Sequence, residues 1–480
     1  MAETNPETIY DVAVMGGGPA GYTAAIRGAE YGLKVALIDA SPRLGGTCLH
    51  VGCIPTKALL FNAEIWEHVL DGAEFGIKIG EGGIGTPTLD WAAVLARKNA
   101  IITKHVKGLE FLMRKHKIAV VPGYARLTGP ARDGVHTVDV DKDGVKSQVK
   151  AKNVIVATGS AAKLLPGLQA DQTILTNIEI LEMSAPPKSL VVIGAGAVGV
   201  EFASIFRSFR TEVTILEFLP RMVPVEDEEI AKELARVFRK RGIETYVGAK
   251  VEKVEKTESG VRVSYTDANG AAQVKEAEKV LVAVGRSAQT VDIGLEKTKV
   301  EVERGFVKVD ETQETAEPGV YAIGDIVAGL PQLAHVGAMS GMVAMAKIAG
   351  QKYRPVRRDR IPSCTYCDPQ IGSAGLTEAQ AKEKGHEIKV GKFPFAGNSK
   401  ATIVGSHDGF VKVVADAKYG EILGVHIIGP QATELIAEAV AVMELEGTVD
   451  ELMFTIHAHP TLTEALLDGY GAVEGMAINA

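Results

Sequence analysis

The chain has 480 residues, of which 46% are hydrophobic and 23% are charged. This composition allows about three domains with buried cores and excludes an intrinsically disordered protein. The formal net charge of −8 argues against a nucleic-acid partner and against an anionic membrane surface, because both favour a basic face. Only four cysteines occur, so the chain is not a disulfide-stapled secreted scaffold.

The first residues contain neither a basic segment followed by an apolar one nor an Arg- and Ser-rich amphipathic helix. No run of about 18 apolar residues occurs anywhere, so no membrane span is predicted. We therefore expect a cytoplasmic protein; the mature form of an imported protein would have the same features.

A pattern of strand, glycine-rich turn, helix and strand occurs twice, in residues 11–39 and 190–217. In such a unit the first glycine permits a sharp turn, the second lets a pyrophosphate approach the backbone, and the third lets helix and strand pack closely. The N-terminus of the helix binds the phosphates, and the acidic residue after the second strand binds the ribose. One such match is weak evidence, but two in the same context predict two dinucleotide sites. The glycines are Gly16, Gly18 and Gly21 in the first copy and Gly194, Gly196 and Gly199 in the second, and the acidic residues are Asp39 and Glu217.

Glu217 also bears on the choice of nicotinamide cofactor. A carboxylate here accepts a hydrogen bond from a ribose 2′-hydroxyl and repels a 2′-phosphate, which would need an arginine. The first basic residue after it is Arg221, which follows Phe218, Leu219 and Pro220. The second site is therefore predicted to take NAD rather than NADP.

The other apolar segments complete an α/β pattern. Each copy is closed by an apolar strand that ends at a glycine, Gly159 in the first and Gly285 in the second. A further strand at 319–325 runs into a turn at Asp325, which alone would indicate only a hairpin corner. Shorter strands are expected at 119–121 and 135–140, and the chain from about residue 357 is expected to form a separate α+β unit with strands at 409–414 and 422–428.

Cys48 and Cys53 follow the first dinucleotide unit directly. Residues five apart in a regular helix are displaced by about 7.5 Å along its axis, whereas a disulfide needs Cα atoms roughly 4.4–6.8 Å apart. A bridge would therefore need a distorted turn, which Gly52 and Pro55 can provide. A strained, accessible disulfide is easily reduced and would suit redox chemistry; the alternative is two buried free thiols.

The segment 457–464 combines two histidines with an acidic residue. Thr461 and Glu464 have the spacing of a capping box for a following helix, so Glu464 has a structural interpretation. His457 and His459 would share one face of a strand, as metal ligands can, but no third and fourth ligand stands nearby. A histidine oriented by a carboxylate can also take a proton from a thiol.

Cys364 and Cys367 have the two-residue spacing of redox and zinc motifs. Their surroundings are predicted to be extended, so the two side chains would face opposite sides of a strand. A second pair that could complete a zinc site is absent from the sequence, and we expect both cysteines to be structural.

Four features together resemble the pyridine nucleotide–disulfide oxidoreductases: the doubled dinucleotide unit, the motif Gly-Gly-Thr-Cys…Cys-Ile-Pro-Thr-Lys, the turn at Asp325 and the C-terminal His-x-His-Pro-Thr-x-x-Glu. The resemblance runs from about Tyr10 to the C-terminus, and the cysteine motif is highly specific. It implies a glutathione-reductase-like α/β fold with two Rossmann-like domains and a C-terminal α+β dimerisation domain. The implied boundaries are 1–155 and 286–356 for the FAD-binding domain, 156–285 for the NAD-binding domain and 357–480 for the dimerisation domain.

The resemblance implies that FAD binds the first dinucleotide unit and NAD the second. Asp325 would hold the ribityl chain of FAD, and Lys57, paired with Glu201, would lie near the flavin. The remaining FAD contacts would come from Gly46, Thr47, Thr158, Gly159, Ala334 and His335, and Gly285 would add to the NAD contacts.

The implied activity is the oxidation of protein-bound dihydrolipoamide with reduction of NAD⁺, in a 2-oxoacid dehydrogenase or glycine cleavage complex. Cys48 and Cys53 would form a redox-active disulfide, in which the substrate attacks Cys48 and Cys53 lies against the flavin. The enzyme would be a homodimer, and His459, oriented by Glu464, would reach the partner subunit's Cys48 and deprotonate the substrate.

Several positions depart from the family pattern. After Ala334 and His335 the family commonly has a lysine and then a glutamate, where this chain has Val336 and Ser340. These positions lie where flavin and nicotinamide should meet, so they bear on the flavin's potential and on the rate of NAD⁺ reduction. Three further positions that differ without removing a catalytic group are His50, Gln289 and Gln370.

Close relatives fit less well. Glutathione reductase would need arginines after the second acidic strand, mercuric reductase would carry a C-terminal cysteine pair, and soluble transhydrogenase would lack the pair at Cys48 and Cys53. Two other functions stay open: a reductase of quinones or of another disulfide with the same machinery, and a subunit whose main role is docking on a multienzyme complex.

Overall fold

The computed structural model describes residues 8–78 and 85–479. The chain forms two compact units, and the division falls within helices α3 (Cys53–Leu70) and α4 (Trp91–Lys115). The first unit comprises residues 8–58, 95–163 and 286–356, and the second comprises 59–78, 85–94, 164–285 and 357–479. Among the helices in these ranges, none has the length and apolar character needed to cross a membrane.

The first unit is built on a mixed sheet in the order β3-β2-β1-β6-β5-β4, with β19 paired to β6. Strands β3, β2, β1, β6 and β19 are parallel, and β5 and β4 continue the sheet in antiparallel fashion. Val14, Leu37 and Ile155 on the parallel strands are completely buried, as expected where elements cover both faces of a parallel sheet. The strands are β1 (Ile9–Met15), β2 (Val35–Asp39), β3 (Ala119–Pro122), β4 (Tyr124–Leu127), β5 (His136–Lys142), β6 (Val145–Val156) and β19 (Val320–Ala322).

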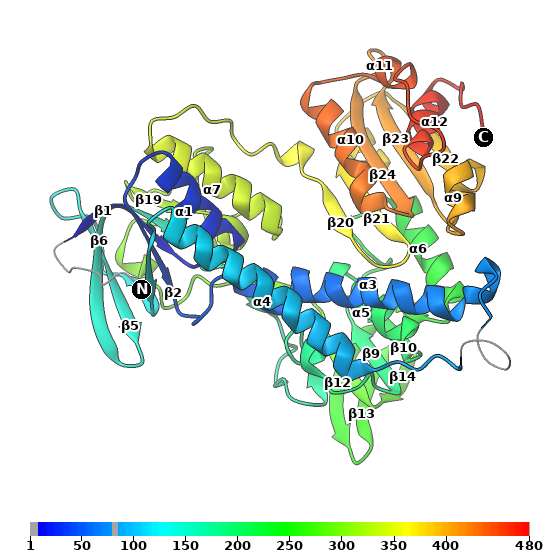
Figure 1. The fold of residues 1–480 in the computed structure, drawn as a ribbon, viewed down its shortest axis with the longest axis horizontal. Helices are drawn as coiled ribbons and strands as arrows, with labels where there is room; N and C mark the ends of the chain where they lie inside the picture. Colours follow the sequence, from blue (N-terminus) through cyan, green and yellow to red (C-terminus); the bar gives the residue numbers. More distant parts are fainter. Residues whose placement is uncertain (1–7, 79–84, 480) are drawn as a thin grey trace. The chain divides into compact units, whose positions relative to one another are not determined.

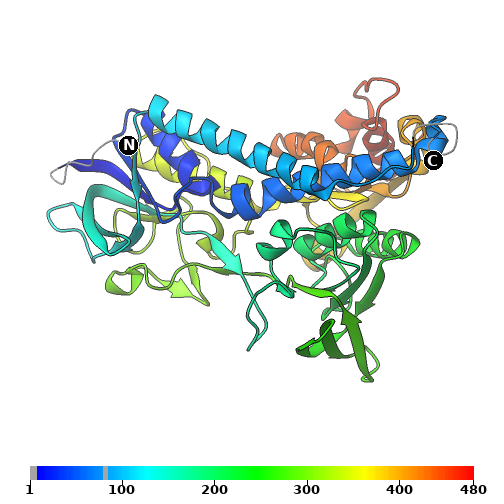
Figure 2. The ribbon, with the colours of Figure 1, turned by 60° about the horizontal axis from the view of Figure 1, so that its bottom comes forward.

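Helices α1 (Pro19–Glu30) and α7 (Ala334–Ile348) lie side by side in this unit (Figures 1 and 2). Small residues allow the close approach: a side chain on Gly341 would begin 2.8 Å from the carbonyl oxygen of Ala20. Gly337, in the first turn of α7, also packs on Ala20. The start of α7 is therefore fixed beside the start of α1.

The second unit contains a parallel sheet in the order β11-β10-β9-β15-β8. Helix α5 (Ala197–Ser208) is buried along most of its length, and Phe202 and Phe206 on it stack at a centroid distance of 6.4 Å. A three-stranded antiparallel sheet, β12-β13-β14, shares a core with the parallel sheet. The strands are β8 (Ile174–Leu175), β9 (Ser189–Ile193), β10 (Glu212–Glu217), β11 (Glu244–Val247), β12 (Lys250–Thr257), β13 (Gly260–Thr266), β14 (Ala272–Ala277) and β15 (Lys279–Val282).

The C-terminal part of the second unit is a five-stranded antiparallel sheet in the order β20-β21-β24-β23-β22. Helices α10 (Ala432–Glu444) and α12 (Glu464–Val473) pack on this sheet (Figure 1), around a core that includes Phe393, Phe395 and Tyr470. The strands are β20 (Ser363–Thr365), β21 (Gln370–Gly375), β22 (Ile388–Pro394), β23 (Phe410–Asp416) and β24 (Ile422–Gly429).

Short elements complete the two units. Strand pairs are β7 (Ser160–Ala162) with β16 (Arg286–Ala288) and β17 (Val302–Glu303) with β18 (Phe306–Val307). The remaining helices are α2 (Gly46–Val51), α6 (Glu228–Lys240), α8 (Glu378–Glu383), α9 (Ser399–Ile403) and α11 (Val449–Met453), and the 3₁₀ turns are η1 (Gly72–Phe75), η2 (Glu179–Glu182), η3 (Leu295–Lys297), η4 (Gly324–Ile326), η5 (Arg358–Arg360) and η6 (Phe395–Gly397).

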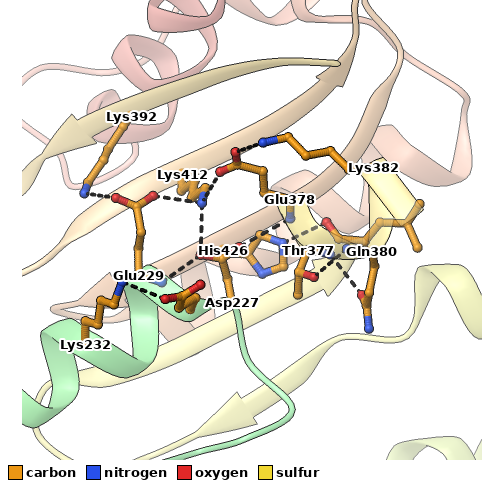
Figure 3. Close-up of polar contacts among 12 residues, drawn as sticks. Asp227, Glu229, Lys232, Thr377, Glu378, Gln380, Lys382, Lys392, Lys412 and His426 are labelled. Carbon is orange, nitrogen blue, oxygen red and sulfur yellow. Dashed lines mark hydrogen bonds and ion pairs between the residues drawn. The ribbon is translucent and has the colours of Figure 1, made fainter. Parts of the chain in front are cut away.

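A buried ion cluster joins α6 to the C-terminal sheet inside the second unit (Figure 3). The Nζ of Lys412, whose side chain is 2% exposed, lies 3.0 Å from Asp227 Oδ1 and 2.8 Å from a carboxylate oxygen of both Glu229 and Glu378. An ammonium group has three donors, so three carboxylates satisfy it completely. These three contacts therefore compensate for the loss of solvation when this charged side chain is buried.

The predicted α/β fold is confirmed, and the strands predicted in both dinucleotide units are present. The strand that closes the first copy begins earlier than expected, at Val145, because it also forms an arm of the β5–β6 hairpin. Both closing strands end before the expected glycines, at Val156 rather than Gly159 and at Val282 rather than Gly285. The four-part domain division stays a prediction.

Candidate active site

The two glycine turns have nearly the same backbone geometry. Gly16 has φ of +113° and Gly194 has φ of +105°, a region that L side chains rarely adopt. A Cβ on Gly16 would lie 2.2 Å from the carbonyl oxygen of Ala157, and one on Gly194 would lie 2.4 Å from that of Ala283. Only glycine fits at the first position of either turn.

The helices that follow these turns begin in the same way. Gly18 and Gly196 are the N-caps of α1 and α5, both 12 residues long, and neither helix has a side-chain cap hydrogen bond. The N–H groups of the first turn are thus available to phosphate oxygens, which the helix dipole also favours. Gly21 and Gly199 let each helix pack closely against its own turn. A Cβ on Gly21 would lie 1.8 Å from the carbonyl oxygen of Gly16, and a Cβ on Gly199 would lie 1.9 Å from that of Gly194.

An acidic side chain faces each turn from the end of the second strand. Asp39 accepts hydrogen bonds from the N–H of Gly17 at 2.5 Å and of Ser41 at 2.6 Å. In the second unit Glu217 accepts from Ala195 at 2.6 Å and from Leu219 at 2.8 Å. Each carboxylate oxygen keeps a second lone pair. Both carboxylates are thereby held where they can accept from ribose hydroxyls.

Arg221, the first basic residue after Glu217, makes a local contact. Its Nη2 donates to the carbonyl oxygen of Pro224 at 2.8 Å. This geometry agrees with the predicted preference for NAD over NADP.

The FAD positions predicted around the first turn come together within the first unit. Gly46 packs against Gly18, and a Cβ on Gly46 would lie 2.8 Å from the Gly18 Cα. Thr47 is in the first turn of α2, and Ala334 and His335 begin α7. Thr158 Oγ1 donates to the carbonyl oxygen of Gln289 at 2.5 Å, and Gly159 follows with φ of +73°. Because glycines at this turn carry no Cβ, a dinucleotide can approach the backbone closely here.

Asp325 belongs to a partly buried polar relay. Its Oδ2 accepts a hydrogen bond from Ser160 Oγ at 2.5 Å, and Ser160 Oγ in turn accepts from Arg286 Nε at 2.7 Å. Arg286 Nη2 also donates to the carbonyl oxygen of Ser160 at 2.6 Å. Burial lowers the pKa of Arg286, while the charges of Asp325 and Cys53 oppose that shift. The relay therefore places a guanidinium group behind the carboxylate that is expected to hold the ribityl chain.

Ser340, one of the departures from the family pattern, has a defined structural role. It is completely buried in α7, accepts a hydrogen bond from the Gly324 N–H at 3.2 Å, and donates to the carbonyl oxygen of Gly337 at 2.9 Å. Gly324 is the residue before Asp325. Ser340 therefore ties α7 to the turn that presents Asp325.

The cysteine pair lies where two helices meet. Helix α2 ends at Val51, Gly52 follows with φ of −143° and ψ of −115°, and α3 begins at Cys53. A Cβ on Gly52 would lie 2.9 Å from the carbonyl oxygen of Thr47. The predicted distortion between the cysteines is confirmed at Gly52, whereas Pro55 lies inside the first turn of α3, where a missing N–H is tolerated.

Cys48 and Cys53 are thiols in this structure, and their side chains are hydrogen-bonded to one another. That hydrogen bond, together with burial, raises the pKa of Cys48, and the charge of Lys57 opposes the rise. The charge of Lys57 thus favours the Cys48 thiolate, which is the reacting form in thiol–disulfide exchange, whereas the hydrogen bond and burial favour the thiol.

A cavity of about 400 Å³ opens onto Cys48 within the first unit. Tyr22 on α1 lines it, and burial, followed by the charges of Cys48 and Cys53, raises the pKa of this tyrosine. The other lining residues come from the start of α1, the N-cap and body of α2, the start of α3, and α4, and are Pro19, Gly45, Leu49, Ile54, His105, Gly108, Leu109, Phe111 and Leu112. The predominance of apolar side chains fits an aliphatic substrate.

His459 and Glu464 form the predicted pair in the second unit. His459 Nδ1 lies 2.9 Å from Glu464 Oε1, and the side chain of His459 is 70% exposed. Burial would raise the pKa of Glu464, but the N–H of Thr461 and the imidazole outweigh burial and lower it. The carboxylate therefore orients the ring and leaves Nε2 directed away from Glu464.

Two expectations for this segment are wrong. Thr461 does not cap the helix: α12 begins at Glu464, Thr463 is its N-cap, and Thr461 Oγ1 bonds the carbonyl oxygen of Ala458 instead. Only half of the expected reciprocal pair is present, the donation from the Thr461 N–H to Glu464 at 2.8 Å. His457 and His459 lie in a loop rather than on a strand. Within residues 8–78 and 85–479, no cluster of three or more His, Cys, Asp or Glu residues could hold a metal ion.

The other two cysteines lie in the second unit. Cys364 is on β20 and its Sγ is 3.9 Å from the carbonyl oxygen of Thr433, whereas Cys367 is completely buried, with Sγ 3.3 Å from that of Pro369. Glu201 is buried on α5 and accepts from the Tyr366 N–H at 2.9 Å. The expected pairing of Glu201 with Lys57 joins residues of the two units and stays a prediction.

Comparison with known proteins identifies the class. Residues 10–341 match the model of the pyridine nucleotide-disulphide oxidoreductases, and residues 361–469 match the dimerisation domain of that family. The chain belongs to the pyridine nucleotide-disulphide oxidoreductase family.

The relatives are more specific. The chain is 42% identical to the dihydrolipoyl dehydrogenase of Bacillus subtilis over 98% of this chain and 99% of that one, and 42% identical to that of Rhizobium etli over 97% and 98%. Among solved structures, LpdA of Mycobacterium tuberculosis matches with a TM-score of 0.87 at 26% identity, covering 96% of this chain and 98% of that one. The HOCl-induced flavoprotein disulfide reductase of Escherichia coli, in its Cu(II) complex, matches with a TM-score of 0.84 at 26% identity, covering 97% and 99%.

These comparisons confirm the expected family, the glutathione-reductase-like fold with a C-terminal dimerisation domain, and a flavoprotein oxidoreductase that uses FAD and NAD. Sequence reasoning missed Ser160, Arg286 and Tyr22. A signal was present for Arg286, which directly follows the glycine that closes the second copy. No local signal marked Tyr22, because the cavity that it lines is formed by elements that lie far apart in the sequence.

Proposed function

We propose that this protein oxidises dihydrolipoamide to lipoamide and reduces NAD⁺ to NADH. The observation that carries the proposal is the Cys48–Cys53 pair at the break between α2 and α3, which opens onto an apolar cavity beside a dinucleotide turn. Full-length likeness to dihydrolipoyl dehydrogenases at 42% identity supports this substrate over other disulfides.

The oxidised enzyme carries a Cys48–Cys53 disulfide in this proposal. A substrate thiolate attacks the Cys48 sulfur, the bond between the cysteines breaks, and Cys53 leaves as a thiolate. The second substrate thiol, once deprotonated, displaces Cys48, so lipoamide departs as a cyclic disulfide and both cysteines are reduced. The substrate has then lost two electrons and two protons. When bound, FAD supplies the two-electron acceptor between the cysteine pair and NAD⁺.

The proton acceptor in this proposal is the imidazole of His459 of the partner subunit. His459 is mostly exposed and held by Glu464 in a loop of the dimerisation domain, so it is available to a second copy of the chain. Glu464 fixes the ring and stabilises the imidazolium that forms when the substrate thiol loses its proton. A homodimer is therefore required for activity.

The Asp325 relay has the task of orienting FAD. Asp325 accepts from the ribityl hydroxyls, and Ser160 and Arg286 keep its carboxylate in one position. Lys57, near Cys48 and paired with Glu201, stabilises negative charge at the cysteine pair. In the second unit Glu217 selects NAD by its acceptor contacts to the ribose.

The physiological partners proposed are the lipoyl-carrying proteins of a 2-oxoacid dehydrogenase or glycine cleavage complex, and the proposed location is the cytoplasm. Full-length likeness to bacterial dihydrolipoyl dehydrogenases supports both statements.

The test is the initial rate of NAD⁺ reduction by dihydrolipoamide with the purified holoenzyme, with NADPH and oxidised glutathione as the control pair. We expect fast turnover with the first pair and negligible turnover with the second. Cys53→Ser should lose the long-wavelength absorbance that a thiolate gives beside a flavin, whereas Cys48→Ser should keep it. If dihydrolipoamide is not oxidised while NADH still reduces the bound flavin, the disulfide substrate is a different molecule.

A further inference from the structure

Helix α4 carries an exposed aromatic side chain between four cations. Phe111 is 57% exposed. Lys104 and Lys107 precede it by seven and four residues, and Arg114 and Lys115 follow it by three and four residues. Residues at these spacings lie on one face of a helix. All four cationic residues are exposed. We call these five residues the α4 face.

The cations of this face form no ion pairs with the described residues of the chain. No ion pair joins Lys104, Lys107, Arg114 or Lys115 to a carboxylate anywhere in residues 8–78 and 85–479. The single acidic residue of α4 is Glu110, in a chain whose net charge is −8. A concentration of unpaired positive charge on one helix of an acidic protein is an electrostatic target for an acidic partner.

The α4 face adjoins the redox cavity. Phe111 lines the cavity that holds Cys48, and the same helix contributes His105, Gly108 and Leu109 to its wall. A dithiol that reaches Cys48 through this cavity must enter past this wall. A protein that carries the dithiol on an arm is therefore brought against the side of α4 that bears the cations.

We propose that the α4 face docks an acidic protein domain that presents the dithiol substrate. The inference rests on the proposed function, because a protein would dock at the rim of the cavity only if the dithiol substrate is attached to a carrier protein. Phe111 provides an apolar contact at the centre, and the four cations steer the carrier to it and set its orientation. A nucleic acid is disfavoured by the overall negative charge, and a second copy of the chain is a distinct outcome of the test.

The experiment compares two substrates of the same holoenzyme: free dihydrolipoamide and a reduced lipoyl domain of net negative charge. For the wild type, kcat/KM with the acidic domain should fall steeply between low and high ionic strength, because salt screens charges beyond about 8 Å at physiological strength. With uncharged dihydrolipoamide it should stay nearly constant. Equal salt dependence with both substrates would overturn the proposal without any variant.

The variant is Lys107→Glu combined with Arg114→Glu, two positions of the α4 face that do not line the cavity. At low salt we expect kcat/KM for the acidic domain to fall about tenfold or more, as for rim charges that steer association, with free dihydrolipoamide unaffected. The matched control is Lys142→Glu combined with Lys146→Glu in the exposed β5–β6 hairpin of the same unit. A similar loss in this control would show a general charge effect and overturn the proposal.

Two further measurements distinguish docking of a carrier from contact between copies of this chain and from failure of the proposed function. Gel filtration of Lys107→Glu/Arg114→Glu should give the same mass as the wild type; dissociation would assign the face to contact between copies of this chain and overturn the proposal. If the wild type does not oxidise free dihydrolipoamide, the proposed function fails, whereas oxidation of both substrates with no response to charge defeats only the docking inference. Lys107→Gln/Arg114→Gln gives the same comparison if the reversed charges prevent folding.

Discussion

The two glycine turns share one backbone geometry but differ in what surrounds them. In the first, a Cβ on Gly17 would lie 2.5 Å from Leu44, and the Cα of Gly46 stands against Gly18. In the second, the position equivalent to Gly17 is Ala195, and no atom of the described residues lies within 4 Å of a Cβ built on Gly196. The first turn is thus closed over by the segment that leads to the cysteines, and the second is open. This difference suits a cofactor that stays bound in the first site and a cosubstrate that exchanges in the second.

The largest effect should come from filling the closed turn. Gly46→Ala places a methyl group 2.8 Å from the Gly18 Cα at a residue with φ of +57°, and displacing the turn should cut turnover about 100-fold, as misplacements of about 1 Å do. We expect the purified protein to retain much less flavin absorbance than the wild type. Gly196→Ala, the matched change in the open turn, should keep its flavin and raise only the KM for NAD⁺. Equal flavin content in the two variants would contradict the distinction between closed and open turns.

The second unit has a large buried charge of its own, at Lys412. Burial would lower the pKa of Lys412, but its three carboxylates outweigh burial and raise it. Burial would raise the pKa of Asp227 and Glu229, but both are lowered, because contacts that include the lysine outweigh it. Lys412→Met leaves the buried carboxylate of Asp227 without its cationic partner and should cost about 3–5 kcal/mol of stability at neutral pH.

The pH dependence of that loss has a definite sign. Carboxyl groups whose folded pKa is depressed contribute stability that is present above their unfolded pKa and is lost as pH falls through the folded pKa. The difference in unfolding free energy between wild type and Lys412→Met should therefore be full at pH 7 and shrink as pH falls below about 4. Urea unfolding across this range measures it, with Lys232→Met, which pairs with Glu228 on the exposed surface, as the control. A difference that grew on acidification would show that the carboxylates are not the source.

The closed site also has a partly buried positive charge, that of Arg286, and its removal has a smaller expected effect. Arg286→Gln removes the guanidinium that holds Ser160 and, through it, Asp325. Loss of a hydrogen bond to a charged group costs about 1.5–3 kcal/mol, so FAD should bind about ten- to a hundredfold more weakly. Fluorescence of released FAD on dilution measures this. Arg286→Lys should recover part of the affinity, and an unchanged affinity in Arg286→Gln would show that the relay does not act on the cofactor.

The two sites also show what a sequence reveals. The glycines and the acids Asp39 and Glu217 could be found because the requirement is local: a turn with positive φ, a helix N-terminus and a strand end follow one another along the chain. The Ser160–Arg286 contact and the Lys412 cluster could not, because each joins residues more than a hundred positions apart through side chains whose types are common on surfaces. Thr461 shows the opposite error. Its spacing to Glu464 is that of a capping box, but Glu464 is also held by His459, and the helix begins at the glutamate.

The smallest effect should be a change of cofactor preference confined to the open site. Glu217→Gln keeps the length of the side chain but converts one acceptor oxygen into a donor and removes the charge that repels a 2′-phosphate. The preference for NAD⁺ over NADP⁺, as the ratio of kcat/KM values, should fall about tenfold, which corresponds to about 1.4 kcal/mol. Asp39→Asn makes the same change in the closed site and should leave this ratio unaltered, since its carboxylate faces the other turn. A shift with Glu217→Gln alone would support nicotinamide binding at the second turn. If Asp39→Asn moved the ratio as far as Glu217→Gln does, the assignment of FAD to the closed turn and NAD to the open turn would be wrong.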